Sequence, residues 1–421
     1  MKSNFFKDII IIIIITIVSL FALNIVFHYW LMYSEKNDVT YIDIEKNFLN
    51  KYSSIIQDQP EKKFSKYLTI YEINPPNLRN DIFYIQNPAN TNIIFCEEEN
   101  GLIEFTTDKF GFRNKNGKNK YDVIILGDSF TEGACVDDEK SIPGVINSRK
   151  KVSIYNGGKG GTGLIYFALA ADKLSNEIKN KIIAVNLIQG ISINRMFSTI
   201  KNYPNIFEQK LEFLDEEKKL SLVNHRMFHK LYFEKYNELR IKKFEDDSFF
   251  LKSKKLISHT ALYLGLKKIF KNYVYYTGER APVCDKLNEN RLLIKKSIKS
   301  LYNTSVKNES KLVIFYIPTF WNYMKDVDNN FYRNLSKNSD CEFNLIKKIA
   351  SEIDSSVIIE DKRFIFEGFP HKEIRDIYFA NNHDLRFTMG LSYVRGHYSE
   401  IGFEKISDSI SLSLQNILSN N

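Results

Sequence analysis

The chain has 421 residues, of which 43% are hydrophobic and 26% charged, and its formal net charge is +8. This balance is typical of a globular protein with a full hydrophobic core, and it excludes a wholly disordered chain. The lysines are spread along the whole sequence, without a nucleic-acid-binding motif. We therefore expect no nucleic-acid partner, although a diffuse positive field would favour an anionic polysaccharide or a membrane surface.

The N-terminal segment predicts a single membrane anchor. Residues 9–32 contain no charged side chain, and at about 1.5 Å per residue such a helix crosses a hydrocarbon core of about 30 Å. Lys2 and Lys7 precede it and charges of both signs follow it, so the N-terminus is expected in the cytoplasm and the rest outside. A cleavable signal peptide is the alternative, but no small-x-small site follows. Residues 1–33 are assigned to a cytoplasmic stub and anchor.

Residues 34–119 are polar and mixed, with prolines breaking the segment. We interpret this stretch as an extracytoplasmic stalk and partial cap that packs on the edge of the following domain. Residues 103–113, which end in Gly-Phe-Arg, predict a short hairpin just before the first strand of that domain.

A buried strand that ends at a serine follows. Residues 123–126 are apolar and mostly β-branched, which predicts a strand buried on both faces, and Gly127-Asp128-Ser129 ends it. A helical segment is expected over about 139–150. A serine at such a strand–turn–helix junction lies at the carboxyl edge of a parallel sheet, where nearby amides can stabilise negative charge. An ordinary turn is the alternative for Gly-Asp-Ser alone.

Short apolar strands and amphipathic helices alternate through the rest of the chain. This alternation predicts a parallel, doubly wound α/β sheet. Residues 197–282 interrupt it with a lysine- and aromatic-rich helical insertion. Its aromatic side chains either stack on sugar rings or form the inner face of a helical cap. The strands are expected at 152–155, 181–188, 311–317 and 356–360, and the helices at 164–180, 287–302, 343–353 and from 400 to about 418.

The loop at 156–163 reads NGGKGGTG. Glycines let backbone amides approach a ligand closely and can form an oxyanion pocket. A phosphate cradle is the obvious alternative, but the spacing matches neither GxGxxG before a dinucleotide helix nor a P-loop that ends in GK[ST]. A structural turn remains a further alternative.

The blocks GDSFT at 127–131, with Gly133, Val136 and Asp137, and NGGKGG at 156–161 resemble the GDSL/SGNH hydrolase family. The resemblance is to the membrane-tethered bacterial branch of the family and covers about residues 120–421. The resemblance implies a flavodoxin-like three-layer α/β/α sandwich that hydrolyses or transfers O-acyl groups. It implies Ser129 as the nucleophile, with the amides of Ser129 and Gly161 as oxyanion donors.

The C-terminal Gly-His-Tyr-Ser at 396–399 resembles the fifth block of the family, in which His397 would be the general base. The family's aspartate, two or three residues earlier, is absent. In serine proteases, loss of that charge lowers turnover about 10⁴-fold. Asp384, or less plausibly Asp376, is a substitute from the same region, and a Ser–His dyad oriented by a backbone carbonyl is the alternative.

The third block also departs from the family pattern. Ile191 stands where an asparagine would donate to the oxyanion, and Asn194 or Gln189 would have to supply the amide from a shifted position. Losing one such donor costs about a hundred- to a thousandfold in rate.

The cysteines at 96, 135, 284 and 341 show no CxxC spacing and no histidine pairing, so we expect no zinc site. Cys284 and Cys341 are the more plausible disulfide pair, because each precedes a predicted helix on the same edge of the sheet. Free buried cysteines are the alternative. The chemistry implied by the resemblance needs no metal or cofactor.

The leading hypothesis is an anchored, extracytoplasmic serine esterase or O-acyltransferase that acts on acylated, often acetylated, envelope glycans or another small ester. The alternative is a catalytically degenerate relative that binds envelope polysaccharide or scaffolds its assembly. A structural membrane protein without a glycan role would explain none of the motifs.

Overall fold

The computed structural model describes Ser19 and residues 64–66, 86–87, 89–98, 101–115, 117–202, 283–324, 330–381 and 395–420. Apart from Ser19, these belong to one compact unit formed by Glu61–His225 and Arg280–Asn421. Except for Ser19 and residues 197–202, the expected anchor (1–33) and the expected insertion (197–282) lie outside the described residues. Among the residues that are described, no helix is both long and apolar enough to cross a membrane.

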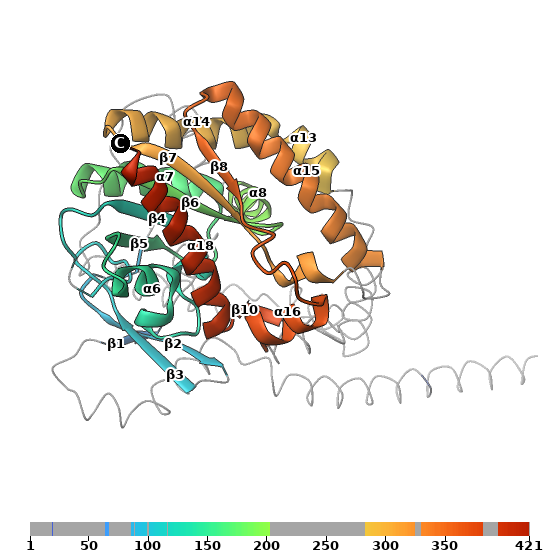
Figure 1. Cartoon of the computed structure of the whole chain (residues 1–421), viewed down its shortest axis with the longest axis horizontal. Helices are drawn as coiled ribbons and strands as arrows, with labels where there is room; N and C mark the ends of the chain where they lie inside the picture. The colour runs from blue at the N-terminus through green and yellow to red at the C-terminus, as the bar shows by residue number, and fades with distance from the viewer. Residues whose placement is uncertain are drawn as a thin grey trace, which may run out of the picture. The chain divides into compact units, whose positions relative to one another are not determined.

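The core is a five-stranded sheet in the order β5-β4-β6-β7-β8, and every neighbouring pair is parallel (Figure 1). β4, β5 and β6 are buried along their whole length, which agrees with their continuous apolar sequences. Ile124 of β4 lies opposite Tyr155 on one side and Ile183 on the other. The strands are β4 (Val123–Gly127), β5 (Ile154–Gly158), β6 (Ile182–Ile188), β7 (Lys311–Ile317) and β8 (Ile358–Asp361).

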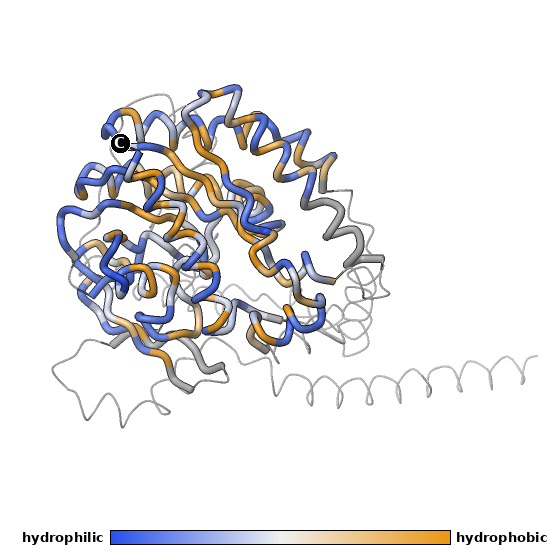
Figure 2. The backbone as a smooth tube through the Cα atoms, viewed as in Figure 1, coloured by the Kyte–Doolittle hydropathy of each residue, from blue (hydrophilic) through white to orange (hydrophobic). Residues whose placement is uncertain are grey.

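Helices cover both faces of the sheet. Ile124 and Leu126 point into a cluster with α7 (Leu164–Glu177) and α14 (Arg291–Lys307). The alternate residues Val123 and Ile125 point into a second cluster, which is completed by α6 (Ile142–Ser148) and α18 (Glu400–Ser419). The result is a three-layer α/β/α sandwich. Figure 2 shows apolar strands between helices that are apolar on one side and polar on the other.

The strand order corresponds to 2-1-3-4-5 along the chain, as in flavodoxin-like sheets. The crossover direction reverses at β4, so β4 and β6 border the crevice at the carboxyl edge where open α/β sheets place their ligands. The Gly-Asp-Ser turn follows β4 directly. The predicted α/β architecture with a parallel sheet is therefore confirmed.

A separate sheet precedes the core. β1 (Phe64–Lys66) pairs in parallel with β2 (Asn92–Glu98), which pairs antiparallel with β3 (Gly101–Thr106). The hairpin predicted over 103–113 is only partly right, because the main partner of β3 lies upstream in β2. A single bridge from Thr107 to Arg113 closes the Gly-Phe-Arg turn.

Several helix boundaries differ from the expectation. The segment expected over about 139–150 is divided at Ser141 into a 3-10 helix, η1 (Asp138–Lys140), and α6. The predicted helix 287–302 is two helices, α13 (Val283–Glu289) and α14, which meet at Asn290. α15 (Asn330–Ile353) begins 13 residues before the expected start at Phe343, whose position the structure places in mid-helix. Cys284 and Cys341 form a disulfide, as proposed. The reason given for the pair was wrong, since both lie within helices and do not precede them.

The remaining short elements lie around the carboxyl edge of the sheet. An antiparallel pair of strands there carries the Gly-His-Tyr-Ser sequence ahead of α18. These elements are α5 (Ser129–Glu132), η1 (Asp138–Lys140), α8 (Ser192–Asn202), η2 (Phe320–Tyr323), α16 (His371–Tyr378), β9 (Phe379–Asn381) and β10 (Arg395–Tyr398).

Candidate active site

The turn after β4 presents Ser129 at the start of α5. Asp128 is extended and caps α5, because its side chain accepts a hydrogen bond from the Phe130 amide at 3.0 Å. Asp128 is fully buried, whereas Ser129 keeps 8% of its surface exposed. The turn thus holds the serine hydroxyl at the carboxyl edge of the sheet with access from outside.

β10 brings His397 to this serine. Nε2 of His397 lies 2.8 Å from Oγ of Ser129, across a sequence separation of 268 residues. The imidazole also packs 4.8 Å from the Phe130 ring. The next residue, Tyr398, is buried and donates its hydroxyl to the Pro318 carbonyl. The strand that carries the histidine is therefore fixed to the end of β7.

The environment of His397 keeps its ring neutral. Burial lowers the pKa of the imidazole to about 3, and the positive charge of Arg195 acts in the same direction. Nδ1 is buried and has no hydrogen-bond partner in the described part of the chain. Asp384, the predicted orienting carboxylate, lies outside the described residues. Asp376 is on α16 and exposed, so it does not supply the partner for Nδ1.

The glycine-rich loop after β5 lies beside the nucleophile turn. The Lys159 amide donates to the Gly127 carbonyl at 3.0 Å, which joins the loop to the end of β4. Gly161 has φ +82°, a conformation that glycine adopts without strain. Among the described contacts, the amides of Ser129 and Gly161 donate to no protein acceptor.

A buried carboxylate holds the glycine loop in place. Glu132, at the end of α5, accepts a 2.7 Å hydrogen bond from the Gly160 amide. Its other oxygen accepts from Asn87, and Asn87 accepts from the buried Lys159 ammonium at 2.6 Å. Asn87 precedes β2, so the segment interpreted as a cap contributes a side chain that contacts Glu132 and the glycine loop. Sequence reasoning missed this network because its members are far apart in the chain.

The predicted amide substitutes in the third block have hydrogen-bond partners of their own, Asn194 in the same loop and Gln189 in the segment after β7. Asn194 donates to the Gly190 carbonyl at 2.7 Å. Gln189 donates to Asn322 and accepts from the Thr319 amide, both at 3.3 Å. The structure therefore gives both side chains partners other than Ser129, which removes the reason for assigning Asn194 to the oxyanion site.

Arg195, one residue after Asn194, reaches the Gly-Asp-Ser turn instead. Its Nη1 lies 2.9 Å from Oδ2 of Asp128, and 31% of the arginine side chain remains exposed. Burial raises the pKa of the Asp128 carboxyl, and Arg195 opposes that rise. Sequence reasoning overlooked this arginine because the family pattern directs attention to an amide.

The loop at residues 189–191, which belongs to the third block, also contacts a buried glutamate of α15. Glu342 accepts a 2.9 Å hydrogen bond from the Gly190 amide. Burial raises the pKa of Glu342 to about 7, although the hydrogen bonds to this carboxyl pull it down. Glu342 follows Cys341, whose disulfide ties α15 to α13.

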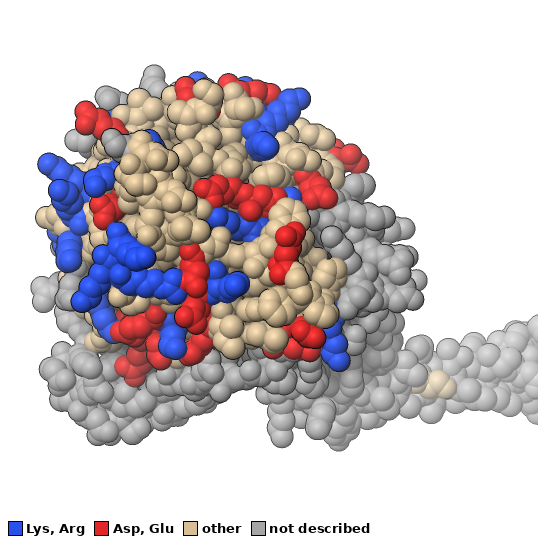
Figure 3. All heavy atoms as spheres, in the orientation of Figure 1, with Lys and Arg blue, Asp and Glu red and all other residues tan. Residues whose placement is uncertain are grey.

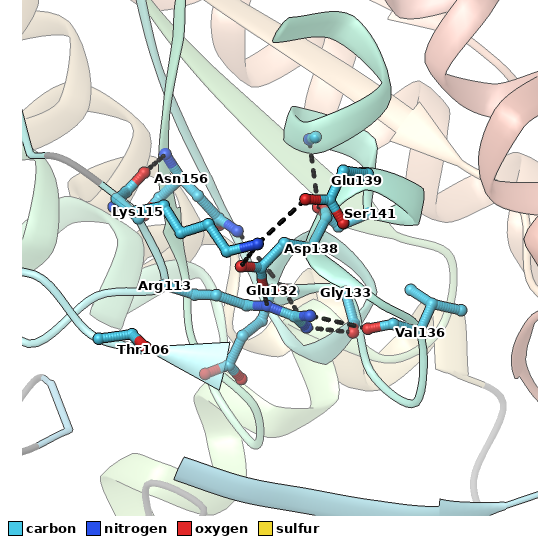
Figure 4. Close-up of polar contacts among 12 residues, drawn as sticks. Thr106, Arg113, Lys115, Glu132, Gly133, Val136, Asp138, Glu139, Ser141 and Asn156 are labelled. Atoms are coloured by element: carbon cyan, nitrogen blue, oxygen red, sulfur yellow. Dashed lines mark hydrogen bonds and ion pairs between the residues drawn. The ribbon is translucent and has the colours of Figure 1, made fainter. Parts of the chain in front are cut away.

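Arg113 of the Gly-Phe-Arg turn clamps the loop that follows the nucleophile helix (Figure 4). Its guanidinium donates to the carbonyls of Gly133 at 2.6 Å and Val136 at 2.7 Å, and to the Asp138 carboxylate at 2.6 Å. Arg113 is buried and also covers the Phe105 ring. Sequence analysis assigned no role to Arg113, and the structure makes it a positioning residue for the loop at 133–138.

The face of the unit that carries α6 and α18 has side chains of both charges. Figure 3 shows lysine and arginine groups beside aspartate and glutamate groups over the face that carries α6 and α18 in Figure 1. In the described ranges, no three His, Cys, Asp or Glu side chains are grouped as metal ligands would be.

Comparisons with known proteins add little. No family model matches the chain. No curated protein matches it either. Among solved structures, it is similar to a protein assigned to the G-D-S-L family of lipolytic proteins from Desulfitobacterium hafniense, with 12% identity, a TM-score of 0.31, and coverage of 70% of this chain and 99% of that one.

Two further solved structures are similar at 8% identity. A GDSL-like lipase from Bacteroides ovatus has a TM-score of 0.34, with 75% of this chain and 57% of that chain covered. The salicylyl-acyltransferase SsfX3 from a tetracycline biosynthetic pathway has a TM-score of 0.33, with 75% and 58% covered. Likenesses this weak establish neither a family nor an activity.

Proposed function

We propose that the chain is a serine-dependent esterase or O-acyltransferase. The observation that carries this proposal is the 2.8 Å contact between Ser129 Oγ and His397 Nε2. A serine hydroxyl is a weak nucleophile until a neighbouring base takes its proton, and a protein that only binds a glycan has no need of such a pair. The resemblance of the GDSFT block to SGNH hydrolases points to the same chemistry.

In the proposed reaction, Ser129 Oγ attacks the ester carbonyl carbon while its proton passes to His397 Nε2. The tetrahedral intermediate collapses, the ester C–O bond breaks, and His397 returns the proton to the departing alcohol. Water then attacks the acyl-enzyme in hydrolysis, or an acceptor hydroxyl attacks it in transfer. His397 takes the attacking proton and gives it back to Ser129 Oγ.

Backbone amides are the proposed oxyanion donors. The N–H groups of Ser129 and Gly161 would receive the negative charge that develops on the carbonyl oxygen. Asn194 is left out of this set because its amide donates to Gly190. The chemistry uses a nucleophile, a base and donors, so we propose no metal or cofactor.

We further propose that a carboxylate from the segment that contains Asp384 is the partner of His397 Nδ1. The buried Nδ1 atom without a partner among the described residues motivates this assignment. A carboxylate there would orient the imidazole and stabilise its charged form, which the present environment disfavours. If no acid reaches Nδ1, the pair works as a dyad.

The substrate class and compartment are also proposals. The uncharged N-terminal segment 9–32 supports a single-pass anchor in a bacterial cytoplasmic membrane, with the domain outside. The disulfide between Cys284 and Cys341 supports an oxidising compartment. An acylated, often acetylated, envelope glycan or another small ester is the proposed substrate.

Two observations favour the alternative of a silent glycan-binding relative. The pKa of about 3 makes His397 a weak base as long as Nδ1 has no acidic partner. The third-block asparagine is also replaced by Ile191. These two departures are what a protein that has lost catalysis would show.

The test uses the full-length protein in detergent, with p-nitrophenyl acetate and a serine-directed fluorophosphonate probe. We expect the wild type to react with both, and Ser129→Ala and His397→Gln to lose turnover by at least about a thousandfold, since removing a nucleophile or base has effects of this size. Asp384→Asn separates triad from dyad: a triad would lose activity and a dyad would keep it.

His371→Gln is the matched control, because this histidine lies at the start of α16 and has its nearest described ring contact with Tyr323 at 6.1 Å. It should keep full activity. A folded wild type that neither labels nor turns over the ester would favour the binding protein.

A further inference from the structure

The third-block position lacks a side-chain amide directed at Ser129, yet it holds a cation. We infer that Arg195 supplies the positive charge that stabilises the oxyanion in place of the missing asparagine. This inference rests on the proposed function, and it adds a catalytic residue that the family pattern does not include. Three observations on the described residues carry it.

The first observation is the pairing with the Gly-Asp-Ser turn. Arg195 Nη1 lies 2.9 Å from Oδ2 of Asp128, which is fully buried and directly precedes Ser129. A guanidinium keeps its positive charge at every ordinary pH and holds its donors in a rigid fork, so the turn that presents Ser129 has a permanent cation beside it. The side chain is 31% exposed, so the site is reachable from solvent.

The second observation is the position of α8 against the glycine loop. A Cβ atom added at Gly163 would meet the backbone of Met196 and Ser192 at 2.5 Å and of Arg195 at 3.0 Å. Only glycine permits this close approach. The first turn of α8 thus packs directly against Gly163, at the end of the loop that contains Gly161, and the same turn carries the arginine that pairs with Asp128.

The third observation is electrostatic. The positive charge of Arg195 disfavours the charged form of His397, so it acts across the site and not only on Asp128. A cation in a partly buried site stabilises an adjacent oxyanion more strongly than a neutral amide does, because the local dielectric is low. The same charge would attract the developing oxyanion.

The competing explanation is that Arg195 only neutralises the buried Asp128. Removing one partner of a buried pair is strongly destabilising, so a simple substitution could fail for that reason alone. The double variant Asp128→Asn/Arg195→Gln avoids this problem, because it leaves no charge buried. Asparagine still caps α5, and the two amide side chains can form a hydrogen bond with each other.

The experiment measures kcat and KM for p-nitrophenyl acetate, a neutral ester, with the full-length protein. The variants are Arg195→Gln, Arg195→Ala and the double variant, and urea unfolding is followed in parallel. We expect kcat/KM to fall about a hundred- to a thousandfold, mainly in kcat, in all three. Added guanidinium ion should partly restore Arg195→Ala.

Arg149→Gln is the matched control. Arg149 is 34% exposed and pairs with Glu404 and Asp408 on α18, so it resembles Arg195 in exposure and charge but is outside the site. It should leave kcat unchanged. A folded double variant that turns over at the wild-type rate would overturn the inference and make Arg195 a counter-ion only.

The activity of the wild type toward the ester and the phosphonate probe distinguishes this outcome from failure of the proposed function. A wild type that is inert toward the ester and the phosphonate probe removes both proposals. An active wild type with an equally active double variant removes the role of Arg195 alone.

Discussion

At the scale of single residues, the site is defined by what surrounds His397. Its Nε2 meets Ser129, its ring packs on Phe130, and its Nδ1 is buried without a described partner. Burial, with a smaller contribution from the charge of Arg195, lowers the pKa of the imidazole and keeps it neutral. A base that is neutral at every ordinary pH is available to take a proton, but it holds that proton weakly.

This environment predicts an unusual pH dependence. For an ordinary histidine with a pKa of about 6.5, the neutral fraction of the imidazole falls about thirtyfold by pH 5. With a pKa of about 3, His397 stays deprotonated over this range, so the rate of fluorophosphonate labelling should remain flat from pH 8 to pH 5. Labelling rates measured across this range check the prediction.

The control for this measurement is Glu342→Gln, because the Glu342 carboxyl has a pKa of about 7 and supports the third-block loop. If the wild type shows a small inflection near pH 7, this variant should lack it. A decline centred near pH 6.5 in both proteins would contradict the depressed pKa of His397.

At the scale of elements, the site depends on short turns that are fixed by side chains from elsewhere. Glu132 holds the glycine loop, and Arg113 holds the loop after α5. Both are buried, and both satisfy backbone groups that no strand or helix pairs. The turns that present the reacting groups are therefore rigid without being part of the sheet.

Replacement of Arg113 should destabilise the protein. Arg113→Met keeps most of the packing of the side chain but leaves the Gly133 and Val136 carbonyls and the Asp138 carboxylate without their donor. We expect the free energy of unfolding to fall by about 3–5 kcal/mol, measured by urea denaturation. Phosphonate labelling should slow as the nucleophile turn loosens.

Arg149→Met is the comparison, since its ion pairs are at the surface and such pairs contribute about 0–1 kcal/mol. Equal losses in the two variants would show that Arg113 is no more than a surface charge.

At the scale of the whole unit, a disulfide links two helices on one face of the sheet. Cys284 of α13 and Cys341 of α15 are 57 residues apart in sequence. Closing a loop of this length removes entropy from the unfolded chain, with an upper estimate of about 4 kcal/mol. The bond also fixes the part of α15 that carries Glu342 beneath the Gly190 loop.

The double variant Cys284→Ser/Cys341→Ser should therefore be less stable by about 2–4 kcal/mol. Urea unfolding without reductant measures this difference and leaves the disulfide of Cys135 intact. We also expect ester turnover to fall, because the Glu342 contact is less well fixed. An unchanged unfolding midpoint would mean that the two helices are held by packing alone.

The sequence by itself determined the elements whose signal is local. Continuous apolar runs predicted the five strands, the Gly-Asp-Ser turn predicted Ser129 at the carboxyl edge, and short motifs singled out the glycine loop and His397. These signals are readable because strand burial and turn chemistry depend on neighbours within a few residues.

Only the tertiary structure decided which distant residues meet. It joined Ser129 to His397 across 268 residues, gave Asp128 an arginine partner, and made Arg113 a clamp. It also paired β3 with β2 and extended α15 toward its N-terminus. These outcomes depend on packing and charge pairing between segments far apart in the chain, and no local periodicity encodes such partners.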